Sequence, residues 1–317
     1  MKNHNILVSI LVPVYNTERY IEKCARSLFD QSYTNIEFIF INDSSPDKSI
    51  NILTHLIEKE YTHLRSNIKI ISHQKNKGLA AARNTAIEAA NGDYIIHVDS
   101  DDYLEKNCIE KLVKEAKRSN ADFIICDYWE ILPDKSVYRY RNFKYKNQYL
   151  KSLIAFQTPP CIWGNLIRRE LYIQNNIKTI EQINYAEDYT VISKLIYNAS
   201  FISKVNQALY YYLGTNPNSY MNQPISQNQI KQTLIAFETV SNFFSHKKNY
   251  KIAITLGFIH IRNLYFSKYK TILHEKNEGN YIHSILRFDS FIKKCNIPIL
   301  NKITNRIYKL INSYLSY

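Results

Sequence analysis

The chain has 317 residues, of which 45% are hydrophobic and 22% charged, so it can bury a sizeable globular core. Its formal net charge of +13 is uneven, because residues 1–224 carry 27 basic and 24 acidic side chains whereas residues 225–317 carry 14 and 4. The five cysteines are scattered, which disfavours a disulfide framework and indicates a reducing cytoplasm, and no apolar run approaches the roughly 18 residues of a membrane span.

In chain order, the first part alternates between apolar runs and amphipathic stretches. Residues 6–14 are mostly apolar and β-branched, which predicts a central strand buried on both faces, and a helix follows through Leu28. Strand and helix in this rhythm predict a doubly wound, mainly parallel α/β sheet, which binds ligands at the carboxyl ends of its strands. The further predicted strands are 36–41, 68–72, 94–98 and 122–126, and the further helices are 50–57, 79–87 and 105–118.

Three carboxylates follow the apolar run of residues 94–98. They are Asp99, Asp101 and Asp102, and like charges this close repel one another unless a cation joins them. Mg²⁺ or Mn²⁺ is the natural candidate, since these ions prefer oxygen ligands and commonly take one or two carboxylates together with phosphate oxygens. The alternative is a solvated acidic turn that caps the helix starting near Glu105.

Glycine-rich phosphate loops are absent from the sequence. Neither GxGxxG nor GxxxxGK[ST] occurs, and the chain has six glycines. A nucleotide would therefore be held by a carboxylate-bound metal and by side chains.

The second part of the chain is less regular. Residues 130–155 are basic and aromatic and are expected to be irregular, a last strand is predicted at 205–213, and residues from 229 onward are expected to be helical. Glu187 and Asp188 precede an apolar helical run.

Five short motifs, taken together, resemble those of glycosyltransferase family 2, the inverting nucleotide-sugar transferases of the A-type fold. The resemblance spans roughly residues 6–215. It departs at Asn42, where the family often has an acid, at 44–46, where it often has a glycine-containing turn, and near 211–215, where it often has an arginine or histidine but this chain is uncharged. The matching motifs are Val12–Asn16, Ile41–Ser45, Asn76–Asn84, Asp99–Asp102 and Glu187–Asp188.

The resemblance implies that Asp101 binds Mn²⁺ or Mg²⁺ and that Asp99 contacts the ribose or reaches the metal through water. Asp43 follows a strand and can accept the imide N–H of uracil, with Pro13 and Tyr15 flanking the base. Bland alternatives remain for several residues: Asp43 as a helix cap, Tyr15 in ordinary packing and Arg83 as a surface arginine. The predicted nucleotide-sugar-binding residues are Pro13, Tyr15, Asn16, Asp43, Asn76, Arg83, Asp99 and Ser100.

Inversion requires a base opposite the leaving group. The resemblance favours Asp188 as this base, with Glu187 orienting acceptor or metal-side groups, although both acids could simply cap the following helix. Trp163 is either a stacking wall for the acceptor sugar or a core residue.

The expected domains are a catalytic domain at 1–224, with a nucleotide half at 1–128 and an acceptor half at 129–224, followed by a basic helical region at 225–317. The apolar stripes of this last region could pack on the catalytic domain, or the region could dock on anionic lipid headgroups; no nucleic-acid recognition motif is present.

The expected function is the transfer of a hexose or N-acetylhexosamine from a UDP-sugar to a glycan or lipid-linked glycan in bacterial polysaccharide or lipopolysaccharide synthesis. The enzyme is expected to be cytoplasmic and peripheral at the inner face of the cell membrane. The alternatives are a sugar nucleotidyltransferase, and a non-catalytic nucleotide-binding protein with a membrane-docking tail. The nucleotidyltransferase would need a glycine-rich basic loop near the N-terminus, where residues 13–16 read Pro-Val-Tyr-Asn.

Overall fold

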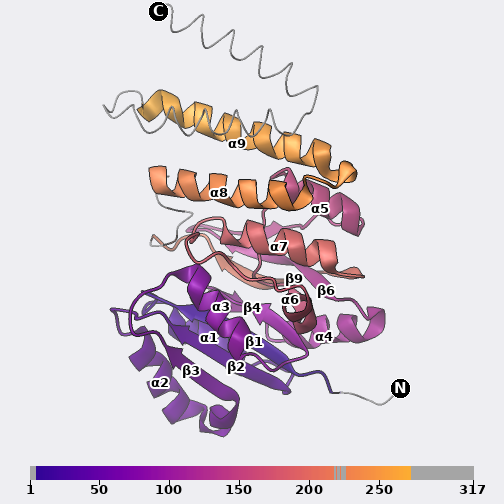
Figure 1. The fold of residues 1–317 in the computed structure, drawn as a ribbon. Coiled ribbons are helices and arrows are strands. Elements are labelled where there is room, and N and C mark those ends of the chain that lie inside the picture. The colour runs from indigo at the N-terminus through magenta and orange to yellow at the C-terminus, as the bar shows by residue number, and fades with distance from the viewer. Residues whose placement is uncertain (1–4, 218, 220–221, 223–225, 273–317) are drawn as a thin grey trace, which may run out of the picture. The chain divides into compact units, whose positions relative to one another are not determined.

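The computed structural model describes residues 5–217, 219, 222 and 226–272. In this part of the chain, nine strands form one sheet in the order β3-β2-β1-β4-β8-β6-β9-β5, with β7 paired to β6 (Figure 1). The sheet has a parallel half built from the first hundred residues and a mixed half built from later segments.

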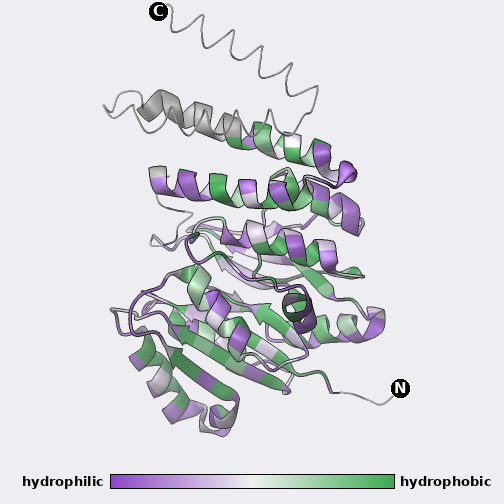
Figure 2. Ribbon diagram, in the orientation of Figure 1, coloured by the Kyte–Doolittle hydropathy of each residue, from purple (hydrophilic) through white to green (hydrophobic). Residues whose placement is uncertain are grey.

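The parallel half is centred on β1 (Val8–Val14), which pairs with β2 (Ile36–Asn42) on one side and β4 (Tyr94–His97) on the other; β3 (Ile68–Ser72) pairs with β2. Every residue of β1 is buried, as its β-branched sequence predicts, and the central strands are mostly green in Figure 2. Because these strands are parallel, their carboxyl ends lie at one edge of the sheet.

Helices connect these strands, and the first of them buries a single apolar stripe. In the first helix the buried side chains are Ile21, Cys24, Ala25, Leu28 and Phe29, at helical spacing. The helices of this half are α1 (Ile21–Phe29), α2 (Ser49–Glu60), α3 (Leu79–Ala89) and α4 (Cys108–Ser119), with a 3₁₀ helix at Thr62–Asn67.

In the mixed half, β8 (Leu166–Arg168) runs antiparallel to both β4 and β6 (Phe123–Ile131), and β9 (Ile202–Leu213) runs parallel to β6. Two short strands, β5 (Tyr103–Leu104) and β7 (Ser136–Arg139), pair antiparallel with β9 and β6. The helices here are α5 (Lys146–Ile154), α6 (Arg169–Gln174) and α7 (Glu187–Asn198).

The predicted fold class, a mainly parallel α/β sheet with C-terminal helices, is confirmed. The region 130–155 was expected to be irregular, and that expectation is wrong, since it contains the end of β6, β7 and α5. The predicted strand at 122–126 extends to Ile131 because β9 and β7 pair with its second part, a long-range contact that local patterns do not encode.

By contacts, the chain divides into two compact units. The first holds residues up to Leu153 and Gln157–Val240, and therefore includes most of α8 (Gln227–Phe244). The second holds Ile154–Phe156 and the chain from Ser241 onward, including a 3₁₀ helix at Lys248–Tyr250 and α9 (Lys251–Ile272). Among the described helices, none combines the length and apolar character that crossing a membrane requires.

Candidate active site

The predicted site residues come from four separate places that the fold brings to the carboxyl edge of the sheet. Asp43 follows β2, Asp99 follows β4, Arg83 lies on α3, and Glu187 and Asp188 open α7. Residues more than a hundred positions apart in the sequence therefore face a common region.

Arg83 is the centre of this arrangement. Its side chain is 2% exposed, and its Nη2 donates to Asp99 Oδ1 at 3.0 Å. Its Nε lies 3.5 Å from Glu187 Oε1 and 3.6 Å from Asp188 Oδ1. Although burial opposes its charge, Asp99, Asp188 and Glu187 raise the pKa of the Arg83 guanidinium, so the cation is enclosed by three acids.

The three carboxylates in the loop after β4 have different partners. Asp102 is 1% exposed and accepts hydrogen bonds from Tyr210 Oη at 2.6 Å and from Leu213 N at 2.7 Å, so it anchors the loop to β9. Burial, followed by the charge of Asp101, raises the pKa of Asp102. Asp101 Oδ2 accepts a hydrogen bond from Asn216 Nδ2 at 2.6 Å, and burial followed by the charge of Asp99 raises the pKa of Asp101 to about 6.

Asp43 is held tightly by its own chain. Its Oδ1 is 2.7 Å from His73 Nδ1 and accepts from Lys77 N at 2.8 Å, while its Oδ2 accepts from Gly78 N at 2.7 Å. His73 Nε2 is in turn 2.9 Å from Thr85 Oγ1. Asp43 is 3% exposed, and these bonds fix the loop that carries the exposed Asn76. Asp43 is therefore not the cap of the following helix, whose N-cap residue is Lys48.

The acid pair sits at a strained entry to α7. Ala186 has a φ of +65°, and Glu187 and Asp188 form the first turn of the helix. Asp188 Oδ2 accepts from Ile162 N at 3.0 Å, whereas its buried Oδ1 has no hydrogen-bond partner among the described residues. Burial raises the pKa of both acids, and the neighbouring Arg83 opposes this rise.

The remaining predicted residues have distinct surroundings. Tyr15 is 47% exposed, Asn16 has a φ of +54° and donates its N–H to Ser45 Oγ, and Pro13 is buried within β1. Ser100 is 5% exposed. Trp163 is 6% exposed, and its ring stacks on Tyr210 and Tyr212 with centroid distances of 4.5 and 5.5 Å.

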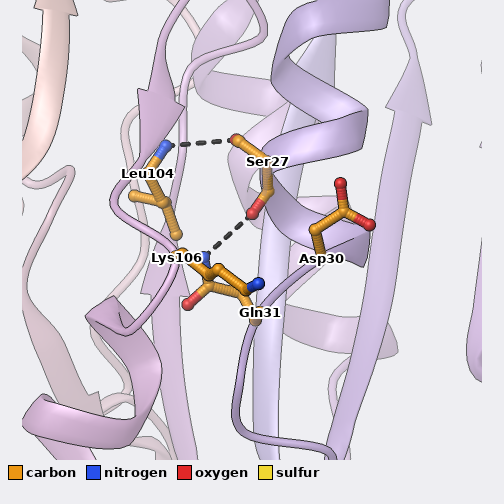
Figure 3. A pocket seen from close by; sticks show the side chains of 5 residues that line it. All are labelled: Ser27, Asp30, Gln31, Leu104 and Lys106. Atoms are coloured by element: carbon orange, nitrogen blue, oxygen red, sulfur yellow. Dashed lines mark hydrogen bonds between the residues drawn. The ribbon is translucent and has the colours of Figure 1, made fainter.

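A hollow of about 420 Å³ lies elsewhere, between α1 and the segment that follows the acidic loop (Figure 3). Two hydrogen bonds join residues that line it, since Leu104 N donates to Ser27 Oγ and Gln31 Nε2 donates to Ser27 O (Figure 3). None of the predicted site residues lines it. We therefore treat the acids around Arg83 as the candidate site.

Residues 9–175, more than half of the chain, match the Glycosyl transferase family 2 profile. The chain belongs to glycosyltransferase family 2. It is 32% identical over 248 residues to the uncharacterized glycosyltransferase EpsJ of Bacillus subtilis (strain 168), covering 76% of this chain and 70% of that relative. The predicted family is thus confirmed.

Solved structures share the fold of this glycosyltransferase. Residues 1–349 of S. aureus TarS in complex with UDP-GlcNAc superpose with a TM-score of 0.66 at 20% identity, covering 86% of this chain and 77% of that one. The mannosyltransferase PcManGT of Pyrobaculum calidifontis, in complex with GDP-Man and Mn²⁺, gives a TM-score of 0.51 at 15% identity, covering 86% and 82%. Because the sequence identities are low, this likeness establishes the A-type fold alone.

The side chains of this glycosyltransferase suit a hard divalent ion. Asp99 and Asp101 offer carboxylate oxygens. Burial, followed by the charge of Asp99, raises the pKa of Asp101, and a bound cation would relieve the repulsion between the two acids. Within the described residues, no group of three or more His, Cys, Asp or Glu side chains is arranged to hold a metal. Mg²⁺ and Mn²⁺ commonly complete their shells with water and substrate phosphates, so two carboxylates fit such an ion.

Several residues of the site escaped the sequence-based prediction. His73 and Asn216 act through partners 30 or more positions away, and no local pattern marks them. Asp102 was singled out as one of three carboxylates, but its hydrogen bonds to Tyr210 and Leu213 were not predicted. A signal existed for Asn216, because it lies one residue beyond the stretch where the family resemblance leads one to look for a charged side chain.

Proposed function

We propose that the protein transfers a hexose or N-acetylhexosamine from a UDP-sugar to a hydroxyl of a glycan acceptor, with inversion at the anomeric carbon. The observation that carries this proposal is the position of Arg83, which contacts Asp99 on one side and Glu187 and Asp188 on the other. A donor held at Asp99 and Asp101 would have its leaving group and its catalytic base in one site, as a single displacement requires.

The nucleotide is proposed to lie along the ends of β1, β2 and β4. Each carboxylate oxygen has two lone pairs, so Asp43 Oδ2 can accept a uracil N–H in addition to Gly78 N. Tyr15, with its exposed ring, would stack on the base beside Pro13. Arg83 Nη1, buried and without a hydrogen-bond partner among the described residues, is the donor that we assign to the diphosphate side. The remaining residues of the proposed nucleotide-sugar site are Asn16, Asn76, Asp99 and Ser100.

Asp101, with Asp99, would hold Mn²⁺ or Mg²⁺. A bound divalent ion supplies neutralisation of the negative charge that develops on the departing diphosphate. Asn216 supports this assignment, since its amide holds Asp101 Oδ2 at 2.6 Å and so fixes the carboxylate.

Asp188 is proposed as the base, acting through Oδ1. Ile162 N holds Oδ2, whereas Oδ1 accepts no hydrogen bond among the described residues and lies 3.6 Å from Arg83 Nε; Oδ1 would take the proton of the acceptor hydroxyl. As the acceptor oxygen bonds to the anomeric carbon, the bond from that carbon to the diphosphate oxygen breaks, and UDP leaves. Glu187 would orient the acceptor, and the buried Trp163 offers little exposed surface to an acceptor sugar.

The acceptor is proposed to be a glycan or lipid-linked glycan of bacterial surface polysaccharide or lipopolysaccharide synthesis, and residues 1–224 are proposed as the catalytic domain. The basic surplus of residues 225–317 supports peripheral docking of a cytoplasmic enzyme on an anionic membrane surface. Much of that region lies outside the described residues. Sedimentation of the full chain with anionic and with neutral vesicles tests this part of the proposal.

Binding and turnover test the core of the proposal. A panel of UDP-sugars, beginning with UDP-N-acetylglucosamine, is added with MnCl₂ while the melting temperature and UDP release are followed. A donor present at a free concentration of 100 times its Kd stabilises the folded protein by about 2.7 kcal/mol. Asp101→Asn should abolish the manganese-dependent part of the shift, and Asp188→Asn should abolish transfer while UDP still binds. The exposed Asp134→Asn is the control. Full turnover in Asp188→Asn, or no response to any UDP-sugar, would overturn the proposal.

A further inference from the structure

Gln232, on α8, accepts two consecutive backbone hydrogen bonds from the loop that leads to the acid pair. Its Oε1 receives Asn184 N at 2.8 Å and Tyr185 N at 2.9 Å. α8 lies beyond residues 9–175, which match the family profile, and within the basic helical region predicted at 225–317. A side chain outside the family's matched segment therefore holds backbone that ends two residues before Glu187.

The residue that Gln232 holds also contacts the nucleotide side of the site. Asn184 Oδ1 accepts from Ala80 N at 3.0 Å, in the first turn of α3. The Asn184 amide also lies against Gly78, so closely that a Cβ on this glycine would be 2.3 Å from Nδ2. Gly78 N in turn donates to Asp43 Oδ2. One short chain of contacts thus runs from Gln232 through Asn184 and Gly78 to Asp43.

The start of the same loop has a separate support. Thr179 N donates to Asn84 Oδ1 at 2.9 Å, and Thr179 Oγ1 donates to Ala80 O at 2.5 Å. Between Thr179 and α7 the chain forms no helix or strand, and Ala186 is in the left-handed region. The end of the loop, next to the acids, is where Gln232 acts.

We propose that Gln232 is a positioning residue for sugar transfer. By accepting the N–H groups of Asn184 and Tyr185, it sets where α7 begins and so where Asp188 stands relative to a donor bound at Asp43 and Asp99. This inference rests on the proposed function for its catalytic consequence, but the hold on the loop is a property of the protein alone. A displacement of about 1 Å at a reacting group can cost about 100-fold in rate.

Amide exchange tests the hold on the loop. Hydrogen–deuterium exchange of the full chain without ligand is followed in peptides covering residues 180–188, for the wild type, Gln232→Met, Gln232→Glu and the exposed neighbour Lys231→Met. Gln232→Met keeps the length and removes the acceptor, so exchange at Asn184 and Tyr185 should accelerate at least about tenfold. Gln232→Glu keeps an acceptor oxygen and should behave as the wild type, as should Lys231→Met. Equal exchange in Gln232→Met and the wild type would overturn the proposal.

Kinetics test the catalytic consequence. UDP release from UDP-N-acetylglucosamine with MnCl₂ should show a kcat lowered about 10- to 100-fold in Gln232→Met, with the UDP dissociation constant changed less than about threefold. Gln232→Glu should restore most of kcat. A kcat within about twofold of the wild type, despite faster amide exchange, would overturn the positioning role. Should Gln232→Met not fold, Gln232→Asn, which withdraws the acceptor by one methylene, answers both questions. No UDP release by the wild type would count against the proposed function, and amide exchange would then decide whether Gln232 holds the loop.

Discussion

Asn216 donates its side-chain amide to Asp101 Oδ2 at 2.6 Å, across 115 positions of sequence. Asn216 is 3% exposed and follows β9. Two residues of that strand, Tyr210 and Leu213, donate hydrogen bonds to Asp102. The acidic loop is thus held from one side by a neutral donor next to the proposed metal ligand.

Replacing Asn216 by Asp should change the response to manganese. A second carboxylate beside Asp101 adds repulsion in the metal-free protein and adds an oxygen ligand when the ion is present. We therefore expect a lower melting temperature without metal and a larger increase on adding MnCl₂. Thermal denaturation with and without manganese measures both, with the exposed Asn142→Asp as control. The same manganese-dependent increase in both variants would contradict this placement.

Gly78→Ala should destabilise the protein and weaken UDP binding. Gly78 has a φ of +89° and a ψ of +165°, a region that is essentially restricted to glycine, and a Cβ would strike the Asn184 amide. The expected cost is about 1–3 kcal/mol in the free energy of unfolding. Because Gly78 N also binds Asp43, the UDP dissociation constant should rise, as calorimetry would show. Adding Asn184→Ala to Gly78→Ala removes the amide that the new Cβ would strike, so the double variant should regain part of the stability lost in Gly78→Ala. An unfolding curve of Gly78→Ala identical to that of the wild type would refute the argument.

The sequence predicted the sheet well where pattern and chemistry are local. The uninterrupted apolar run of β1 is buried along its whole length, and Asp43 and Asp99 follow strand ends as expected. The mixed half was predicted less well, because β6 and β9 owe their extent to pairing with each other across about 80 residues. Long-range pairing leaves no periodic trace in a short window.

The candidate site shows the same division. Arg83 and Asp188 were singled out by motif. Their mutual contact, with Arg83 buried among acids rather than on the surface, arises only when the fold brings α3 near the first turn of α7. Gln232 could not be found from the sequence, because a glutamine on an amphipathic helix is unremarkable until the backbone it accepts from is known.

The pH dependence of transfer should reflect a raised pKa at the proposed base. Burial raises the pKa of Asp188, and the base must be ionised to act. An ordinary aspartate titrates at about pH 4, so kcat should begin to fall at a pH above this value as the solution is made more acidic. The free energy of unfolding should change in the opposite direction to kcat as the pH rises. The folded state binds the proton more tightly than the unfolded state, so ionising Asp188 costs stability as the pH rises from about 4 through its folded pKa. A rate of UDP release that is flat down to pH 4 would contradict this assignment.

Removing Arg83 should be costly, and a thermodynamic cycle should show why. Arg83→Met leaves Asp99, Glu187 and Asp188 crowded without their cation, which for a broken buried pair costs about 3–5 kcal/mol. Asp99→Asn in the same chain removes part of that repulsion, so the double variant should lose less stability than the sum of the two single changes. Urea denaturation of the four proteins measures the coupling. Arg118→Met, which breaks an exposed pair with Glu115, is the control and should leave the urea midpoint close to that of the wild type. If the effects of Arg83→Met and Asp99→Asn simply add, the two residues do not share the buried charge network, and the cation must be stabilised by other groups.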